Sequence, residues 1–244
     1  MGKSDSSQEK GWRSSLTRLV IGVVAWSLMA GTVTEVHAAS TVKQDFRLWA
    51  PIYLTVPLST SFIGYMEVNT RFGDDVSELD QLILRPAIGY KLTDHISLWQ
   101  GYAWIGNYQP RLTEEHRVFQ QLLYKETFPF VKITSRSRLE ERIIERTDGT
   151  AVRARTVLRG DFPLPKIPDW AFVLYDEIFV NLNTVGSGPE AGFDQNRLFL
   201  GMNHQFMKQF NMDVGYQLQA TNNRQSGLIN QINNIILLQF FINL

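Results

Sequence analysis

The sequence predicts an all-β protein, a single antiparallel transmembrane β-barrel of about 12 strands, with 10 strands as the alternative count. Three observations lead to this fold class. Residues 230–244 alternate between a fully apolar face and a mixed, partly polar face, and ten segments upstream alternate in a similar way. The third observation is that residues 1–38 have the layout of a secretory signal peptide. Alternation with period two indicates a strand between an apolar and a wetter environment, and a closed barrel lets the last strand pair with the first.

The N-terminal segment predicts export. Basic residues precede a short apolar run, residues 19–33, and Val36 and Ala38 supply the small residues of a cleavage site. The alternative is a membrane anchor, but this run is short for a span and contains Trp, Ser and Gly. We expect cleavage after Ala38 or Ala39, leaving residues 39–244 as a barrel domain in the outer membrane of a Gram-negative envelope.

Composition excludes several classes of protein. The 244 residues include 24 Lys and Arg, 24 Asp and Glu, and no cysteine. Zero net charge without a basic cluster argues against nucleic-acid binding. The absence of cysteine excludes disulfides, thiolate catalysis and cysteine-ligated metals. No His, Asp or Glu spacing resembles a structural metal site, so we predict neither a metal nor a cofactor.

Eleven strand-like segments follow the signal peptide, joined alternately by shorter and longer connections. They cover residues 45–58, 62–72, 81–91, 96–104, 118–128, 132–144, 152–159, 172–183, 195–206, 212–221 and 230–244. Turns or polar loops lie between them, among them the acidic loop 73–78, the polar loop 107–116, the proline-rich turn 163–168 and the Gly/Ser/Pro loop 184–192.

Each segment is justified by its own alternation. In chain order, apolar positions are represented by Phe46, Val68, Leu84, Leu98, Val118, Leu139, Val152, Leu174, Leu200, Val214 and Ile236. The opposite parity is represented by Arg47, Glu67, Arg85, Ser97, Gln121, Arg138, Arg153, Glu177, Arg197, Asp213 and Asn233. Residues 118–128 alternate least clearly, because polar side chains occupy both parities.

Charge on one face and aliphatic side chains on the other suit lipid outside and a polar lumen inside. A secreted soluble β-sandwich or β-barrel is the alternative, but its charged faces would point outward. Bacterial single-chain barrels use even strand numbers. We therefore expect either one strand more than the eleven recognised, or that residues 45–58 lie outside the wall.

Strand parity directs more basic than acidic side chains into the lumen. The inward basic residues are Arg47, Arg71, Arg85, Lys91, Lys125, Lys132, Arg136, Arg138, Arg142, Arg153, Arg155, Arg159 and Arg197, and the inward acidic residues are Asp45, Glu67, Glu140, Glu177 and Asp213. Ten of them form the predicted lumen charge network: Glu67, Arg71, Arg136, Arg138, Glu140, Arg142, Arg153, Arg155, Glu177 and Arg197.

Two interpretations of this network stay open. Small barrels fill their interior with side chains, and buried charges must be paired, which predicts a lumen closed by Arg–Glu ion pairs with Glu140 and Glu177 holding the arginines together. Guanidinium groups also suit carboxylates and phosphates, which predicts a narrow, porin-like channel that prefers acidic oligosaccharides or other small anions.

A surface-exposed outer-membrane hydrolase is a third hypothesis. His116 with Asp74 and Asp75 is the only His/Asp combination in the loops that we single out. Polar rim residues are the simpler interpretation, so we expect no enzyme. The expected partners are outer-membrane lipid, lipopolysaccharide, and the barrel-assembly machinery, which would engage the C-terminal strand.

Several local strings resemble a known family of bacterial outer-membrane barrels, domain of unknown function 2490. They are Asp45-Phe46-x-Leu48-Trp49, Glu67 with Arg71, Gln120-Gln121, Arg138-Leu139-Glu140-x-Arg142, Arg153-x-Arg155, Tyr175-Asp176-Glu177, Phe193-Asp194-Gln195-Asn196-Arg197 and Gly215-Tyr216. The resemblance implies the fold and the location and brings no activity. Leu244 departs from the aromatic final residue usual in such barrels.

Overall fold

The computed structural model describes residues 42–222 and 229–244. The predicted signal peptide, residues 1–38, lies outside the described residues, so its cleavage stays a prediction. Within the described part of the chain, no helix is long and apolar enough to cross a membrane.

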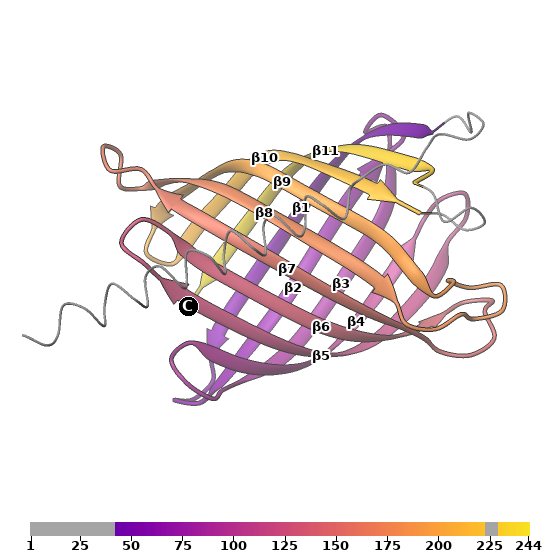
Figure 1. Ribbon diagram of the computed structural model, residues 1–244, viewed down its shortest axis with the longest axis horizontal. Coiled ribbons are helices and arrows are strands. Elements are labelled where there is room, and N and C mark those ends of the chain that lie inside the picture. Colours follow the sequence, from indigo (N-terminus) through magenta and orange to yellow (C-terminus); the bar gives the residue numbers. More distant parts are fainter. Residues whose placement is uncertain (1–41, 223–228) are drawn as a thin grey trace, which may run out of the picture. The chain divides into compact units, whose positions relative to one another are not determined.

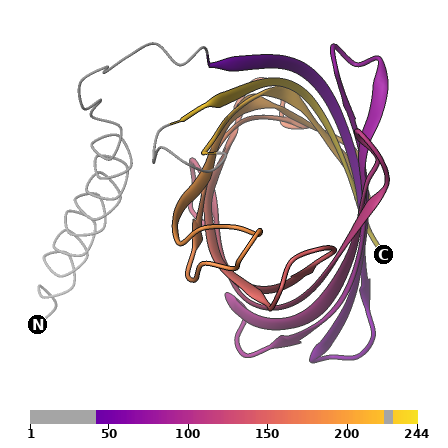
Figure 2. The ribbon, with the colours of Figure 1, turned by 90° about the vertical axis from the view of Figure 1, so that its right-hand side faces the viewer.

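Eleven strands form one closed barrel (Figures 1 and 2). They are β1 (Lys43–Pro57), β2 (Phe62–Gly73), β3 (Glu78–Lys91), β4 (Ile96–Asn107), β5 (Thr113–Thr127), β6 (Lys132–Ile144), β7 (Ala151–Pro163), β8 (Trp170–Asn181), β9 (Gly192–Met207), β10 (Phe210–Thr221) and β11 (Gln231–Asn243). Successive strands are antiparallel neighbours, which confirms the all-β barrel that the alternation predicts.

The expected count of 12 strands, or 10, is wrong. Residues 45–58 do belong to the wall, because β1 pairs with β2 on one side and with β11 on the other. The β1–β11 pair is parallel, with Lys43 opposite Gln231 and Thr55 opposite Asn243. In a ring with an odd number of strands, one pair must be parallel if all the others are antiparallel. The parallel pair of β1 and β11 therefore closes the ring of eleven strands and leaves no free edge. We call this pair the seam.

The connections alternate between the two rims of the barrel. We call the rim with the connections 58–61, 92–95, 128–131, 164–169 and 208–209 the turn end. The opposite rim, with the connections 74–77, 108–112, 145–150 and 182–191, the end of β10 at Thr221 and the start of β11 at Gln231, is the loop end. Because the strand number is odd, β1 starts at the loop end and β11 finishes at the turn end, where Leu244 donates its backbone N–H to the carbonyl of Thr55.

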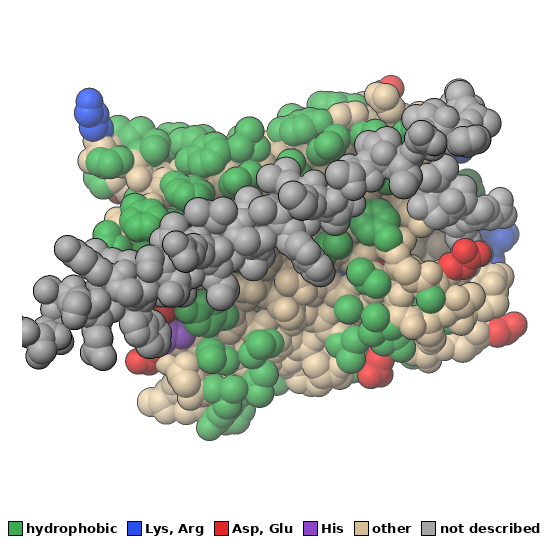
Figure 3. Space-filling view, in the orientation of Figure 1, with side chains coloured by type: hydrophobic (Ala, Val, Ile, Leu, Met, Phe, Trp, Pro, Cys, Tyr) green, Lys and Arg blue, Asp and Glu red, His purple; other side chains and the backbone are tan. Residues whose placement is uncertain are grey.

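The outer surface is apolar on every strand. Large exposed hydrophobic side chains on successive strands include Phe46, Ile52, Phe62, Ile88, Leu98, Val118, Leu122, Leu139, Ile143, Phe162, Leu174, Ile178, Leu198, Leu200, Val214 and Ile236. On the face seen in Figure 3, hydrophobic side chains spread along the barrel and charged side chains lie mostly toward its two ends.

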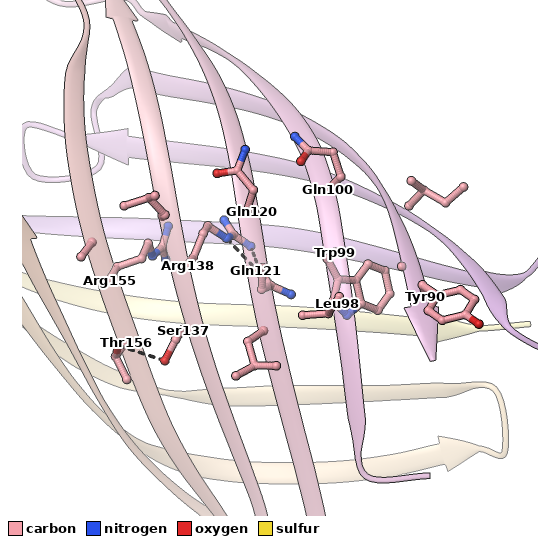
Figure 4. A pocket seen from close by; sticks show the side chains of 15 residues that line it. Tyr90, Leu98, Trp99, Gln100, Gln120, Gln121, Ser137, Arg138, Arg155 and Thr156 are labelled. Atoms are coloured by element: carbon pink, nitrogen blue, oxygen red, sulfur yellow. Dashed lines mark hydrogen bonds between the residues drawn. The ribbon is translucent and has the colours of Figure 1, made fainter. Parts of the chain in front are cut away.

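A few polar side chains also face outward near the middle of the strands. Ser137 and Thr156 are hydrogen-bonded to each other at 3.2 Å (Figure 4). Asn196 donates to Asp176 at 2.7 Å. Gln100 and Gln120 lie opposite each other on β4 and β5. Pairing between neighbouring strands therefore satisfies part of the polar groups that interrupt the apolar outer surface.

Aromatic side chains gather on the outside near the turn end. We call this set the aromatic band: Phe62, Tyr90, Phe162, Trp170, Phe172, Phe206, Phe210 and Phe240. The ring centroids of Phe62 and Tyr90 are 5.2 Å apart, and His204 lies between Trp170 and Phe206 at 4.3 and 4.4 Å. These contacts join residues on β2, β3 and β7 to β11.

Inside the barrel, aromatic rings lie against strands that carry glycine. Gly201 and Gly215 are opposite each other on β9 and β10. A Cβ atom at either position would lie within 2.7 Å of Phe199 Cζ, closer than real contacts allow. The absence of a side chain there lets Phe199 lie flat on the wall, where it stacks on Tyr175 with centroids 4.7 Å apart.

Candidate functional site

The candidate site is the charged lumen, which antiparallel register builds from β5 to β9. On β6 and β7, Glu140 is opposite Arg153, and Arg138 is opposite Arg155. Because side chains of like parity point to one face, these four side chains all enter the interior together. The interior is thus polar where the interior of a soluble barrel would be apolar.

Glu140 is completely buried and holds the centre of the network. Its Oε2 accepts from Arg153 Nη2 at 2.6 Å and its Oε1 from Arg155 Nη1 at 3.1 Å. Arg138 and Arg117 approach the same carboxylate at 3.6 and 4.0 Å. One carboxylate therefore faces four guanidinium groups in a site without access to solvent.

Glu177, on β8, joins a second set of arginines to the first. Its Oε1 accepts from Arg155 Nη2 at 2.6 Å and from Arg136 Nη2 at 2.7 Å, and Arg197 lies 3.6 Å from Oε2. Arg155 bridges the two glutamates, since its other terminal nitrogen contacts Glu140. Charge-assisted bonds of this kind fix side-chain geometry as well as neutralise charge.

Three further ion-paired groups lie in the interior. Glu67 pairs with Arg85 and also accepts from Tyr65 Oη at 3.0 Å. Glu115 pairs with both Arg117 and Arg142, with 2.6 Å to the Nε atom of each. Asp213, which is fully buried, pairs with Arg159, which also binds Asp161.

The arginines of the network also stack on aromatic rings. The guanidinium carbon of Arg138 lies 4.1 Å from the ring centre of Phe119, and that of Arg71 lies 3.8 Å from Trp49. Phe179 carries three such contacts at 4.5 to 5.0 Å, from Arg153, Arg155 and Arg197. Such stacking adds attraction beyond the ion pairs.

The structure brings seven of the ten predicted network residues together, and the other three, Arg71, Arg142 and Glu67, have different partners. Arg71 has no ion pair among the described residues, and it donates to Gln81 Oε1 at 2.8 Å and to Asn69 Oδ1 at 3.4 Å. Arg142 joins Glu115 instead of the Glu140 group. Glu67 has its own partner, Arg85, as described above. The remaining seven residues form the groups around Glu140 and Glu177.

Sequence reasoning missed Glu115 and Arg117, because it assigned residues 107–116 to a loop and began the next strand at residue 118. The structure starts β5 at Thr113, so both side chains face the lumen, where they are 4% and 8% exposed. The signal was present: Glu115, Arg117 and Phe119 alternate with His116 and Val118. The polar character of residues 113–116 hid it.

A chamber of about 690 Å³ lies in the lumen on the turn-end side of the network. Trp49, Phe119, Arg138 and Arg197 belong to its inner limit, which we call the floor, and Lys91, Lys125 and Lys132 lie near the rim. Its lining holds nine Lys and Arg residues (85, 91, 125, 132, 136, 138, 155, 159, 197) and five Asp and Glu residues (67, 94, 126, 161, 177). Figure 4 shows a second pocket, which shares Trp99, Gln121, Arg138 and Arg155 with the chamber, and the hydrogen bond that Arg138 donates to Gln121.

The loop residues considered for hydrolysis are not joined in the structure. His116 Nδ1 is hydrogen-bonded to the Tyr102 hydroxyl, on the outer face of β4 and β5. The backbone N–H groups of Asp74 and Asp75 donate to Asp45 at 3.4 and 3.2 Å. Within residues 42–222 and 229–244, no cluster of three His, Asp or Glu side chains could hold a metal ion.

Comparisons with known proteins match the chain over most of its length. The family model described as "Protein of unknown function (DUF2490)" matches residues 46–230. An uncharacterised protein of Methylorubrum extorquens is 36% identical over 216 residues, which cover 86% of this chain and 92% of that protein. A chain solved in work on the in-meso crystallization of membrane proteins aligns with a TM-score of 0.40 and 14% identity, covering 71% of this chain and 70% of its own.

Proposed function

Since the chain belongs to the family described as protein of unknown function DUF2490, we propose that it is an outer-membrane β-barrel whose lumen is closed by buried ion pairs. In this proposal the barrel is embedded in outer-membrane lipid and lipopolysaccharide and has no catalytic step. It reaches the membrane by secretion and by recognition of its C-terminal strand, β11, by the barrel-assembly machinery.

The observation that carries the proposal is the inverted distribution of side chains. Leu174 and Leu200 are 41% and 50% exposed, whereas Glu140 and Asp213 are completely buried. Exposing such side chains on all strands is unfavourable in water by about 25 cal/mol per Å² of apolar surface. Hydrocarbon around the barrel removes that cost, and the closed ring leaves no unpaired backbone edge in lipid.

The aromatic band gives independent support. Rings such as Tyr90 and Trp170 lie near one rim, on the outside, where a membrane barrel has its interfacial girdle. The turn end has the shorter connections, which in bacterial outer-membrane barrels face the periplasm. We therefore orient the turn end toward the periplasm and the loop end toward the outside.

Ion pairing favours a closed lumen over an open one. A guanidinium group that is buried without a partner costs several kcal/mol, and here Arg153 and Arg155 each contact two carboxylates. Trp49, Phe119 and Phe179 fill space between the arginines. Ions that moved through this level would have to displace paired and stacked side chains.

A narrow anion path is the second candidate. The excess of basic over acidic side chains along the chamber favours it, because guanidinium and ammonium groups lower the barrier for anions. In that case, the chamber would be one half of the path, and the network its selective constriction.

Two measurements on the full chain test the proposal. After expression in a Gram-negative host, the protein should fractionate with the outer membrane, and the folded form should migrate differently from the boiled form in SDS. Recovery in the soluble periplasmic fraction would overturn the membrane location.

Planar bilayers separate the two candidates. A closed lumen predicts no conductance steps above those of the bare bilayer. An anion path predicts conductance steps, and in a KCl gradient their reversal potential should have the sign expected for anion selectivity. A matched variant, Glu140→Gln, sharpens the comparison. An anion path should become more anion-selective in this variant, because a negative charge leaves its constriction.

A further inference from the structure

The chamber at the turn end is lined for a ligand that the ion-pair network does not need. Lys91, Lys125 and Lys132 come from β3, β5 and β6, and within residues 42–222 and 229–244 no carboxylate lies within ion-pair distance of them. Asp161 is opposite Lys132 in the register of β6 and β7 and is ion-paired with Arg159. With nine Lys and Arg residues against five Asp and Glu residues, the lining keeps an excess of positive charge.

Unsatisfied polar atoms around the chamber point the same way. Six buried N–H groups of its lining have no hydrogen-bond acceptor among the described residues: Trp49 Nε1, Arg85 Nε, Arg136 Nε, Arg138 Nη1, Arg197 Nε and Gln217 Nε2. Gln217 is only 2% exposed, and its other amide atom accepts from Tyr175 Oη at 3.0 Å. All six atoms are donors, so the lining lacks acceptors. These atoms are buried within the wall, so they make it rich in donors without being exposed to the chamber themselves.

The opposite side of the chamber is aromatic. Tyr53 on β1 stacks on Phe241 of β11 with centroids 5.0 Å apart and lies 6.3 Å from Tyr65 of β2. These rings belong to the strands at and beside the seam, whereas Lys125 and Lys132 are on the far side of the ring of strands. A cation on one side and aromatic faces on the other can hold the two ends of one molecule.

We propose that the chamber binds an organic anion in which a carboxylate or phosphate is joined to a ring or short chain. The anionic group is held by Lys125 and Lys132, with Arg136 beside them, and the apolar part lies against Tyr53 and Phe241. A volume of about 690 Å³ is that of a site for a small molecule. The network closes the inner end, so the ligand enters and leaves by the turn end.

This proposal depends on the proposed function in one respect: the ligand has a single entrance only if the lumen is closed. Binding can be measured on folded protein in a nonionic detergent, whether or not the barrel conducts. The probe is 1-naphthyl phosphate, and the control is 1-naphthylmethylammonium, a cation with the same ring. Isothermal titration calorimetry should give saturable binding of the phosphate with a stoichiometry of one, and none of the cation.

Two matched double variants locate the site. Lys125→Gln with Lys132→Gln removes two positive charges from the chamber, and Lys166→Gln with Lys208→Gln removes two from connections at the same rim that do not line it. The first pair should weaken the affinity for 1-naphthyl phosphate by about tenfold or more, and the second pair should leave it unchanged. Phe241→Leu should lower the affinity for 1-naphthyl phosphate without changing how that affinity depends on salt concentration.

Each alternative result overturns the site. Equal weakening by both lysine pairs would mean attraction by the rim as a whole, and equal binding of the cation would mean that only the ring is recognised. If the protein does not bind 1-naphthyl phosphate, but its folded and boiled forms still migrate differently in SDS, the binding site is refuted and the membrane proposal is not. A last arm compares dihexanoyl phosphatidic acid with 1-naphthyl phosphate. Tighter binding of the lipid, at the same lysines, identifies a lipid headgroup as the ligand, and tighter binding of the naphthyl compound identifies a free solute.

Discussion

Glu140 concentrates the electrostatics of the interior in one carboxylate. Four arginines contact it, and three of them have a further carboxylate partner: Arg117 has Glu115, Arg153 has Asp194, and Arg155 has Glu177. Arg138 has no carboxylate partner other than Glu140 among the described residues, and its further contacts are a hydrogen bond to Gln121 and the ring of Phe119. Loss of the negative charge at Glu140 is therefore felt most by Arg138.

We predict that Glu140→Gln destabilises the folded barrel by ~3–5 kcal/mol, because it leaves buried positive charge without compensation. The measurement is the urea-unfolding midpoint of protein refolded into lipid vesicles. The control is Glu141→Gln on the same strand, whose side chain is exposed on the outer face. That change should stay within about 0.5 kcal/mol.

A second substitution tests the assignment to Arg138. Adding Arg138→Gln to Glu140→Gln removes the arginine that loses its only carboxylate, so part of the lost stability should return. A double variant that is less stable than Glu140→Gln alone would mean that Arg138 contributes mainly through Phe119 and Gln121.

At this scale the sequence predicted which side chains enter the lumen better than which ones meet. Parity alone directs Glu140, Arg153 and Arg155 to one face, and neighbouring strands place them within reach. Parity cannot tell that Glu177 reaches Arg155 and Arg136 while Arg153 turns to Asp194. That choice depends on the tilt and twist of the strands in the ring, which alternation does not encode.

Among the elements, β8 allows two outward-facing leucines at different heights along the barrel to be compared. Leu174 lies near its middle and Leu182 lies just beyond its loop-end terminus, and both side chains are exposed on the outside, at 41% and 53%. In water the two positions would be alike. In a bilayer they lie at different depths.

We predict that Leu174→Arg costs roughly 2–4 kcal/mol of folding free energy in vesicles, because it places a cation near the midplane, and that Leu182→Arg costs about 0–1 kcal/mol near the interface. Unfolding titrations of both variants in the same lipid give the comparison. Two small and equal effects, as on the surface of a soluble protein, would contradict the membrane assignment.

The strands themselves follow from the sequence, and their boundaries follow less well. Nine of the eleven segments lie within three residues of the observed strands at both ends, whereas β7 runs four residues further, to Pro163, and β5 starts at Thr113 and not near residue 118. Thr113 to His116 are polar, so composition favours a loop there, whereas pairing with Asn107 to Trp104 of β4 extends the strand. Tertiary pairing overrides local preference at this position.

At the scale of the whole barrel, the difference from an even-stranded barrel is where the first strand begins and the last strand ends. Lys43 is at the loop end beside Gln231, and Leu244 is at the turn end beside Thr55. The sequence could not supply this arrangement, because alternation fixes the face of each residue but says nothing of how the first and last strands meet. The assumption of an even count came from other barrels.

We predict that residue 43 and residue 208 are accessible from opposite sides of the membrane. The chain contains no cysteine, so Lys43→Cys, Ser187→Cys and Lys208→Cys can each be labelled alone with a membrane-impermeant maleimide. Lys43→Cys and Ser187→Cys, both at the loop end, should react on intact cells, and Lys208→Cys should react only after the outer membrane is permeabilised. Lys43→Cys that behaves as Lys208→Cys does would mean an even number of strands.

The seam also dictates an order of events during biogenesis. Every other strand pair joins neighbours in sequence, but the seam joins Lys43 to Gln231, across almost the whole described chain. Closing so long a loop is the slowest contact to form and is possible only after β11 exists. Until then β1 waits with an unpaired edge, which can pair with any strand that it meets. A barrel that depends on its last strand in this way needs that edge shielded until the ring is complete.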